Sequence, residues 1–129
     1  MNLNARTAGI LIGVVFVVVG IVGFIPNPLV SPTGLFAVNT AHNLVHLLSG
    51  AAILACALTG VATALSLQIF GVVYALVAIL GFLSHGNMLL GLVRVNHADH
   101  WLHVLLAVVI LAAGFLLPEE KTSSALRSA

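Results

Sequence analysis

Four long apolar runs constrain the fold of this chain more than any other feature. They cover about residues 8–25, 42–58, 64–83 and 100–117. A transmembrane helix needs about 20 apolar residues, with roughly 17–25 tolerated. Strands seldom exceed about ten residues, and a transmembrane barrel needs alternating apolar and polar positions, which these runs lack. Because only helices and closed barrels span a bilayer, the sequence predicts an all-α bundle of four transmembrane helices.

The composition also favours a membrane protein. Hydrophobic residues make up 61% of the chain and charged residues only 5%, whereas a soluble domain carries roughly 25% charged residues. We therefore expect the lipid bilayer to surround the protein. The formal net charge of +1 gives no reason to expect a nucleic-acid partner. The single cysteine, Cys56, excludes an intrachain disulfide and a cysteine-based metal motif.

Proline and glycine residues divide the runs. Pro26 and Pro28 are expected to end the first helix, and Gly60 indicates a short turn between the second and third. The sequence predicts one membrane domain over residues 1–118, followed by a polar, cytoplasmic tail over residues 119–129.

The second half of the chain repeats the first. Displaced by 57 residues, Asn39 falls on Asn96 and His46 falls on His103. At a displacement of 58 residues, the segment 13–16 (Gly-Val-Val-Phe) resembles 71–74 (Gly-Val-Val-Tyr). The chain is therefore predicted to consist of two tandem helical hairpins, repeat 1 over about 8–58 and repeat 2 over about 64–117. Because each repeat crosses the membrane twice, both copies enter it from the same side, as in parallel internal repeats.

The basic residues predict the orientation. Arg6, Lys121 and Arg127 lie on the side of the two termini, whereas Arg94 lies alone on the opposite side. Cytoplasmic segments carry an excess of Lys and Arg, so both termini are expected in the cytoplasm. The polar starts of the second and fourth helices then face the outside.

Those two polar helix starts hold the candidate functional residues. His42 and His46 are four residues apart and share one helix face, and Asp99 and His103 have the same spacing. If the repeats face each other, three imidazoles and one carboxylate meet near the outer membrane boundary. Further polar residues expected to support this cluster are Asn39, Asn43, Asn96 and His100. Asn39 or Thr40 can cap the second helix, and Asn96 or Asp99 the fourth.

Four interpretations of the cluster stay open. The polar groups can satisfy one another and join the repeats, since an unsatisfied buried polar group costs about 1–3 kcal/mol. His42, His46, Asp99 and His103 can bind zinc, copper(II) or non-haem iron through nitrogen and oxygen ligands. His46 and His103 can be axial ligands of a haem. Ionisable groups within a membrane can also mark a path for protons or solutes.

The segments 42–50 (His-Asn-Leu-Val-His-Leu-Leu-Ser-Gly) and 96–103 (Asn-His-Ala-Asp-His-Trp-Leu-His) resemble the signatures of a bacterial membrane family. That family is known as domain of unknown function 4383. The resemblance covers nearly the whole chain and implies four spans, with Gly-Phe ending the first and histidines opening the second and fourth. Its second signature usually has an asparagine where this chain has His100. It implies a bacterial plasma membrane location and no mechanism.

From these observations we expect a small integral membrane protein without its own catalysis, because the chain shows no nucleophile with an adjacent base. Its His/Asp cluster would link the two repeats on the outer side. The protein would serve as an accessory component beside other membrane subunits or copies of itself. The alternative is a metal- or haem-binding membrane protein.

Overall fold

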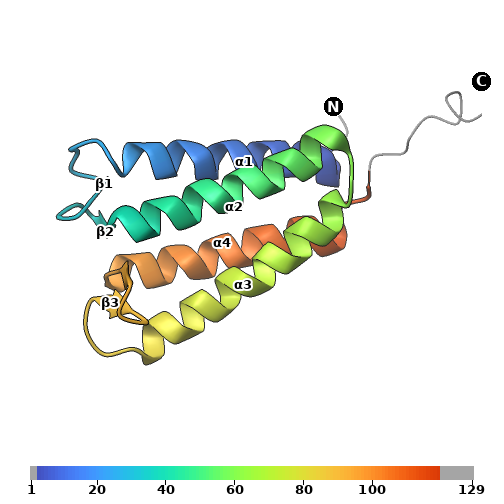
Figure 1. The fold of residues 1–129 in the computed structure, drawn as a ribbon. Coiled ribbons are helices and arrows are strands. Elements are labelled where there is room, and N and C mark those ends of the chain that lie inside the picture. Colours follow the sequence, from blue (N-terminus) through green and yellow to red (C-terminus); the bar gives the residue numbers. More distant parts are fainter. Residues whose placement is uncertain (1–2, 120–129) are drawn as a thin grey trace, which may run out of the picture.

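The computed structural model describes residues 3–119 and contains four long helices in that part of the chain (Figure 1). They are α1 (Ala5–Val22), α2 (Thr40–Thr59), α3 (Thr63–Leu83) and α4 (His97–Leu116). Each is long and apolar enough to cross a membrane. This confirms the predicted all-α bundle of four spans, and the protein is a multi-pass membrane protein surrounded by lipid. Apart from Glu119, the predicted polar tail with Lys121 and Arg127 lies outside the described residues.

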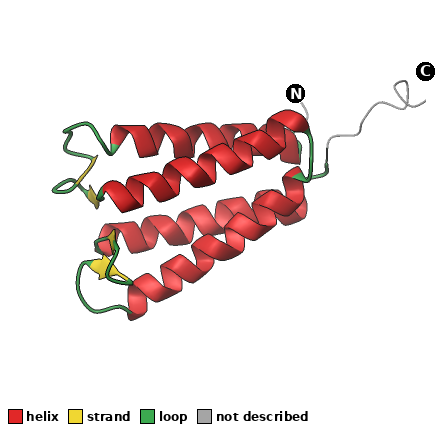
Figure 2. Cartoon of the chain, viewed as in Figure 1, coloured by secondary structure: helices red, strands yellow, loops and turns green. Residues whose placement is uncertain are grey.

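Two small sheets occupy the loops at one end of the bundle (Figure 2). In the first loop, β1 (Val30–Ser31) pairs in parallel with β2 (Phe36–Ala37). In the second, β3 (Met88–Leu89) pairs antiparallel with β4 (Val93–Arg94). The sequence patterns did not indicate these strands. Because both loops lie at the same end, α2 and α4 begin on the same side of the membrane, as the repeat predicted.

Helix α1 is displaced by three residues from its predicted range. It begins earlier because the side chain of Asn4 accepts a hydrogen bond from the backbone N–H of Thr7 at 2.9 Å. It also ends before the prolines. The side-chain amide of Asn27 donates to the carbonyl of Val22 at 3.1 Å, which satisfies an acceptor left free at the helix end.

The helices pack as two hairpins. Helix α1 contacts mainly α2 and α3 contacts mainly α4, whereas contacts between the hairpins are far fewer. Glycines lie at these interfaces. A Cβ added at Gly13 would lie 3.0 Å from the carbonyl oxygen of Gly50, and one at Gly71 would lie 3.1 Å from the backbone nitrogen of Leu111. These glycines allow the helix backbones to approach closely, as is common between membrane helices.

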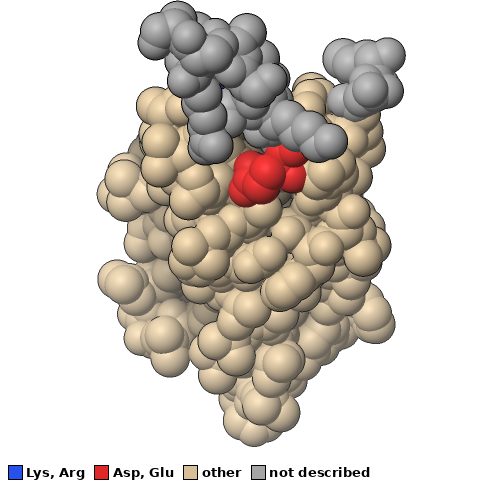
Figure 3. Space-filling model, turned by 90° about the vertical axis from the view of Figure 1, so that its right-hand side faces the viewer, with Lys and Arg blue, Asp and Glu red and all other residues tan. Residues whose placement is uncertain are grey.

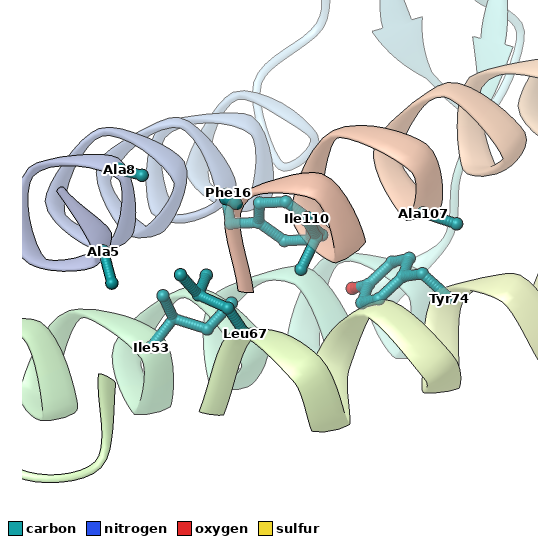
Figure 4. Packing of buried hydrophobic residues seen from close by; sticks show 9 residues of the cluster. Ala5, Ala8, Phe16, Ile53, Leu67, Tyr74, Ala107 and Ile110 are labelled. Carbon is teal, nitrogen blue, oxygen red and sulfur yellow. The ribbon is translucent and has the colours of Figure 1, made fainter. Parts of the chain in front are cut away.

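Buried side chains from all four helices meet between the hairpins (Figure 4). Ile53 and Ile110 occupy equivalent positions of the two repeats, and both are fully buried. Phe16 and Tyr74 are equivalent as well, and their rings meet edge to face with centroids 5.1 Å apart. The repeat seen in the sequence is therefore also a repeat of the packing.

The end of the bundle that carries the termini holds an acidic side chain that caps a helix. Figure 3 views this end, where the red atoms of acidic residues lie beside the grey residues. Most of the visible described surface is uncharged. Helix α3 starts after Ala62, which provides no side-chain cap. The carboxylate of Glu119 instead accepts a hydrogen bond from the backbone N–H of Ala64 at 2.7 Å. Glu119 thus satisfies a free N–H at the start of α3.

Candidate metal centre

The opposite end of the bundle is organised by two capped helix starts. Asn39 caps α2 and accepts a hydrogen bond from the backbone N–H of His42 at 3.0 Å. Asn96 caps α4 and accepts from the backbone N–H of Asp99, also at 3.0 Å. The Asp99 carboxylate accepts in return from the backbone N–H of Asn96 at 2.8 Å, which completes a capping box. Because of this box, α4 begins at His97 rather than at the predicted residue 100.

The same two asparagines connect the hairpins. The side-chain amide of Asn39 donates to the carbonyl of Leu92 at 3.0 Å, and that of Asn96 donates to the carbonyl of Leu35 at 2.8 Å. Leu35 and Leu92 are equivalent residues of the two repeats. Each helix cap therefore also holds the loop of the other repeat, in a reciprocal arrangement.

A second reciprocal pair of hydrogen bonds lies about one helical turn after these caps. The Nδ1 of His42 donates to the carbonyl of Arg94 at 2.7 Å. At the equivalent position of repeat 2, the Asp99 carboxylate accepts a hydrogen bond from the backbone N–H of Ala37. Ala37 and Arg94 are themselves equivalent residues. The structure thus places the Asp99 carboxylate in a helix cap and a loop contact.

Three imidazoles from both hairpins converge beneath these caps. His42, His46 and His103 each offer one ligand atom, and these three atoms lie within 4.8 Å of one another. The Nε2 atoms of His42 and His46 are 3.2 Å apart. The ring centroid of His103 lies 5.5 Å from that of His42 and 6.2 Å from that of His46. The three side chains are between 2% and 5% exposed. We call these three residues the histidine triad.

Two aromatic rings close the inner side of the triad. Phe16 lies 5.2 Å from His46, and Tyr74 lies 6.0 Å from His46 and 5.9 Å from His103, measured between ring centroids. The hydroxyl of Tyr74 donates to the Oγ of Ser49 at 3.1 Å. The sequence interpretation did not include these neighbours among the site residues, although Phe16 and Tyr74 stood out as a matched pair of the repeat.

Asn43 and His100, which were expected to support the cluster, contact glycines within their own hairpins. They are equivalent residues, and each packs on a glycine at the end of the preceding helix: Asn43 on Gly23 and His100 on Gly81. The ring of His100 also lies 5.3 Å from that of Phe82. Both side chains are buried. Their contacts join the helices within each hairpin.

The triad has donors suited to a small metal ion. Nitrogen ligands of tetrahedral zinc lie about 3.3 Å apart, because Zn–N bonds measure about 2.0–2.1 Å. The 3.2 Å separation of the two Nε2 atoms is close to that value. The hydrogen bond from His42 Nδ1 to the Arg94 carbonyl leaves Nε2 of His42 unprotonated, as a metal ligand must be, and metal-bound histidines commonly have such a partner on the other nitrogen.

An ion bound through one nitrogen of an imidazole leaves the other nitrogen of that ring in need of a partner. The Nδ1 atoms of His46 and His103 are buried without a hydrogen-bond partner among the described residues. Such groups cost about 1–3 kcal/mol each when left unsatisfied. A haem fits less well, because the rings of His42, Phe16 and Tyr74 already pack around His46. The packing therefore favours an ion over a macrocycle.

A separate pocket of about 400 Å³ opens at the same end of the bundle. It is lined by the first loop and the start of α2, including Asn27, Asn39 and Asn43. None of the triad residues lines it. The pocket therefore provides no path from the surface to the triad.

A family model described as Domain of unknown function (DUF4383) matches residues 6–116 of the chain. No curated protein and no solved structure matches the chain. The family match agrees with the four spans and with the resemblance of the two histidine segments.

Proposed function

The chain belongs to the DUF4383 family, and on the basis of its buried histidines we propose that it is a non-catalytic membrane protein that binds a transition-metal ion. The histidine triad carries this proposal. His42 and His46 come from the first hairpin and His103 from the second, so one ion would be bound by both repeats. Imidazole nitrogens are suitable ligands for zinc, copper, iron and nickel.

The absence of catalysis is part of the proposal. The triad is buried beneath the capped helix starts, and the aromatic rings of Phe16 and Tyr74 cover its inner side. A catalytic metal needs an open coordination position that substrate or water can reach. The ion would instead hold together two hairpins that make few direct contacts with each other. We infer an accessory role beside other membrane subunits or further copies of this chain.

Elemental analysis of the purified protein tests the proposal. Full-length protein, incubated with one equivalent each of Zn²⁺ and Cu⁺ in separate experiments and then desalted, should retain about one ion per chain. The His46→Ala/His103→Ala double variant should retain almost none. His85→Ala is the matched control, because His85 is an exposed loop histidine. Wild-type protein that retains neither ion would reject the proposal.

The reciprocal hydrogen bonds of Asn39 and Asn96 favour a second candidate function, in which the polar end joins the repeats without an ion. In that case the triad would be a packing element, and its nitrogens would pair with one another. This candidate predicts that added metal ions leave the melting temperature unchanged. It also predicts that the double variant melts at a lower temperature than the wild type in metal-free detergent solution.

We further propose that the triad faces the outside of a bacterial plasma membrane, with both termini in the cytoplasm. The distribution of basic residues along the sequence supports this orientation, because Arg6, Lys121 and Arg127 flank the spans on the side of the termini and Arg94 lies in the loop on the other side. In a Cys56→Ala background, a membrane-impermeant maleimide should label a His85→Cys variant in intact cells. It should label a Thr59→Cys variant only after permeabilisation. The reverse pattern would invert the proposed topology.

A further inference from the structure

The charge and number of donors in the histidine triad indicate which ion it holds. We propose, as an extension of the metal-binding function above, that the triad selects copper(I) over zinc(II) and other divalent ions. The geometry points to a monovalent ion in a three-coordinate site that is built from neutral nitrogen donors. Three observations carry this inference: the donor set, the packing around it and the charge that surrounds it.

The donor set contains only neutral ligands. Among the described residues, the His, Cys, Asp and Glu side chains that gather here are His42, His46 and His103 alone. Asp99, which the repeat places opposite His42, uses its carboxylate to accept hydrogen bonds from the backbone of Asn96 and Ala37. Neutral imidazoles cannot offset the charge of the ion they bind. An ion in the triad therefore keeps its full charge within the bundle.

That charge is costly in a buried site. The idealised cost of moving an ion from water into a protein interior scales with the square of its charge, so a dication costs about four times as much as a monocation. The triad side chains are at most 5% exposed. Among residues 3–119, Asp99 is the only acidic residue at this end of the bundle, because Glu119 caps α3 at the other end. Arg94 lies at the same end and offsets the charge of the Asp99 carboxylate, so no net negative charge compensates a bound ion, and Zn²⁺ leaves twice the uncompensated charge of Cu⁺.

The packing also favours three ligands over four. Zinc in proteins is nearly always four-coordinate, with water as the fourth ligand where the protein supplies three. Around the triad, Phe16 and Tyr74 present rings, and the Tyr74 hydroxyl donates to Ser49. Copper(I) is a d¹⁰ ion that forms stable complexes with two or three donors and has no need of a bound water. Small shifts of the side chains, on the order of 1 Å, would bring three nitrogens into bonding distance.

Competition between the two ions tests the inference on the full chain in detergent. The protein is loaded with one equivalent of Zn²⁺ and titrated under anaerobic ascorbate with Cu⁺ buffered by bicinchoninate. We expect Cu⁺ to displace the zinc, with an apparent Kd roughly 100-fold or more below that for Zn²⁺. X-ray absorption at the copper edge should then show a three-coordinate site of nitrogen ligands.

The outcomes separate this inference from the function on which it rests. Zinc that stays bound against excess Cu⁺ would overturn the copper(I) selection and leave the metal-binding function intact. Protein that binds neither ion would overturn both. His46→Gln serves as a second variant because it keeps a polar side chain of similar length, and it should lose copper binding while still folding. His85→Ala should behave like the wild type.

Discussion

Replacing His103 with alanine is expected to abolish the stabilisation that a bound ion gives to the fold. A ligand that binds only the folded state at 100 times its Kd stabilises that state by about 2.7 kcal/mol. In the wild-type protein the ion binds residues of both hairpins, so this free energy opposes their separation. In His103→Ala the remaining pair, His42 and His46, lies on the single helix α2. An ion bound there no longer joins the two repeats.

The measurement is the shift of the melting temperature on adding Zn²⁺ or, under ascorbate, Cu⁺. The wild type should show a shift of several degrees and His103→Ala almost none. His100→Ala is the matched control, because His100 is another buried histidine of α4 that packs on Gly81 outside the triad. It should keep the metal-dependent shift even if its own stability falls. An unchanged shift in His103→Ala, or a lost shift in His100→Ala, would contradict the assignment of the triad.

Replacing Gly50 with alanine is expected to destabilise the first hairpin by about 1–3 kcal/mol, the usual cost of overpacking a well-packed interior. The added Cβ would lie 2.8 Å from three atoms: the Gly13 carbonyl oxygen, the Phe16 Cβ and the Val17 backbone nitrogen. Two of these are backbone atoms of α1, so relief requires the helices to separate. Because Phe16 also packs on His46, the change should weaken metal binding as well.

Unfolding in mixed detergent micelles, followed by circular dichroism, would measure this loss. Ala51→Val is a suitable control, because Ala51 is the next residue of α2 and is exposed on the bundle surface, where lipid or detergent can accommodate the added methyl groups. Gly50→Ala protein with the stability of the wild type would show that α1 and α2 are not packed as closely as the structure has them.

Much of the architecture follows from the sequence because it depends on local patterns. Apolar runs of spanning length predict helices wherever the chain enters a bilayer. Apart from closed barrels, only a helix satisfies all of its backbone hydrogen bonds there. The repeat of Asn39 and His46 as Asn96 and His103 then placed both polar helix starts on one side. Helix ends were less well predicted, because the end of α1 depends on a side-chain hydrogen bond from Asn27 in the following loop.

The sequence by itself also determined which residue types lie near the site, but the tertiary structure decided which of them converge. Asp99 and His103 share a helix face, yet the first satisfies the start of its own helix and the second reaches the other hairpin. Tyr74 reaches the triad from α3, a contact that helical spacing within one segment does not report. The physical reason is that spacing sets the direction of a side chain. Its partner depends on which hydrogen bonds and packing contacts the assembled helices leave available.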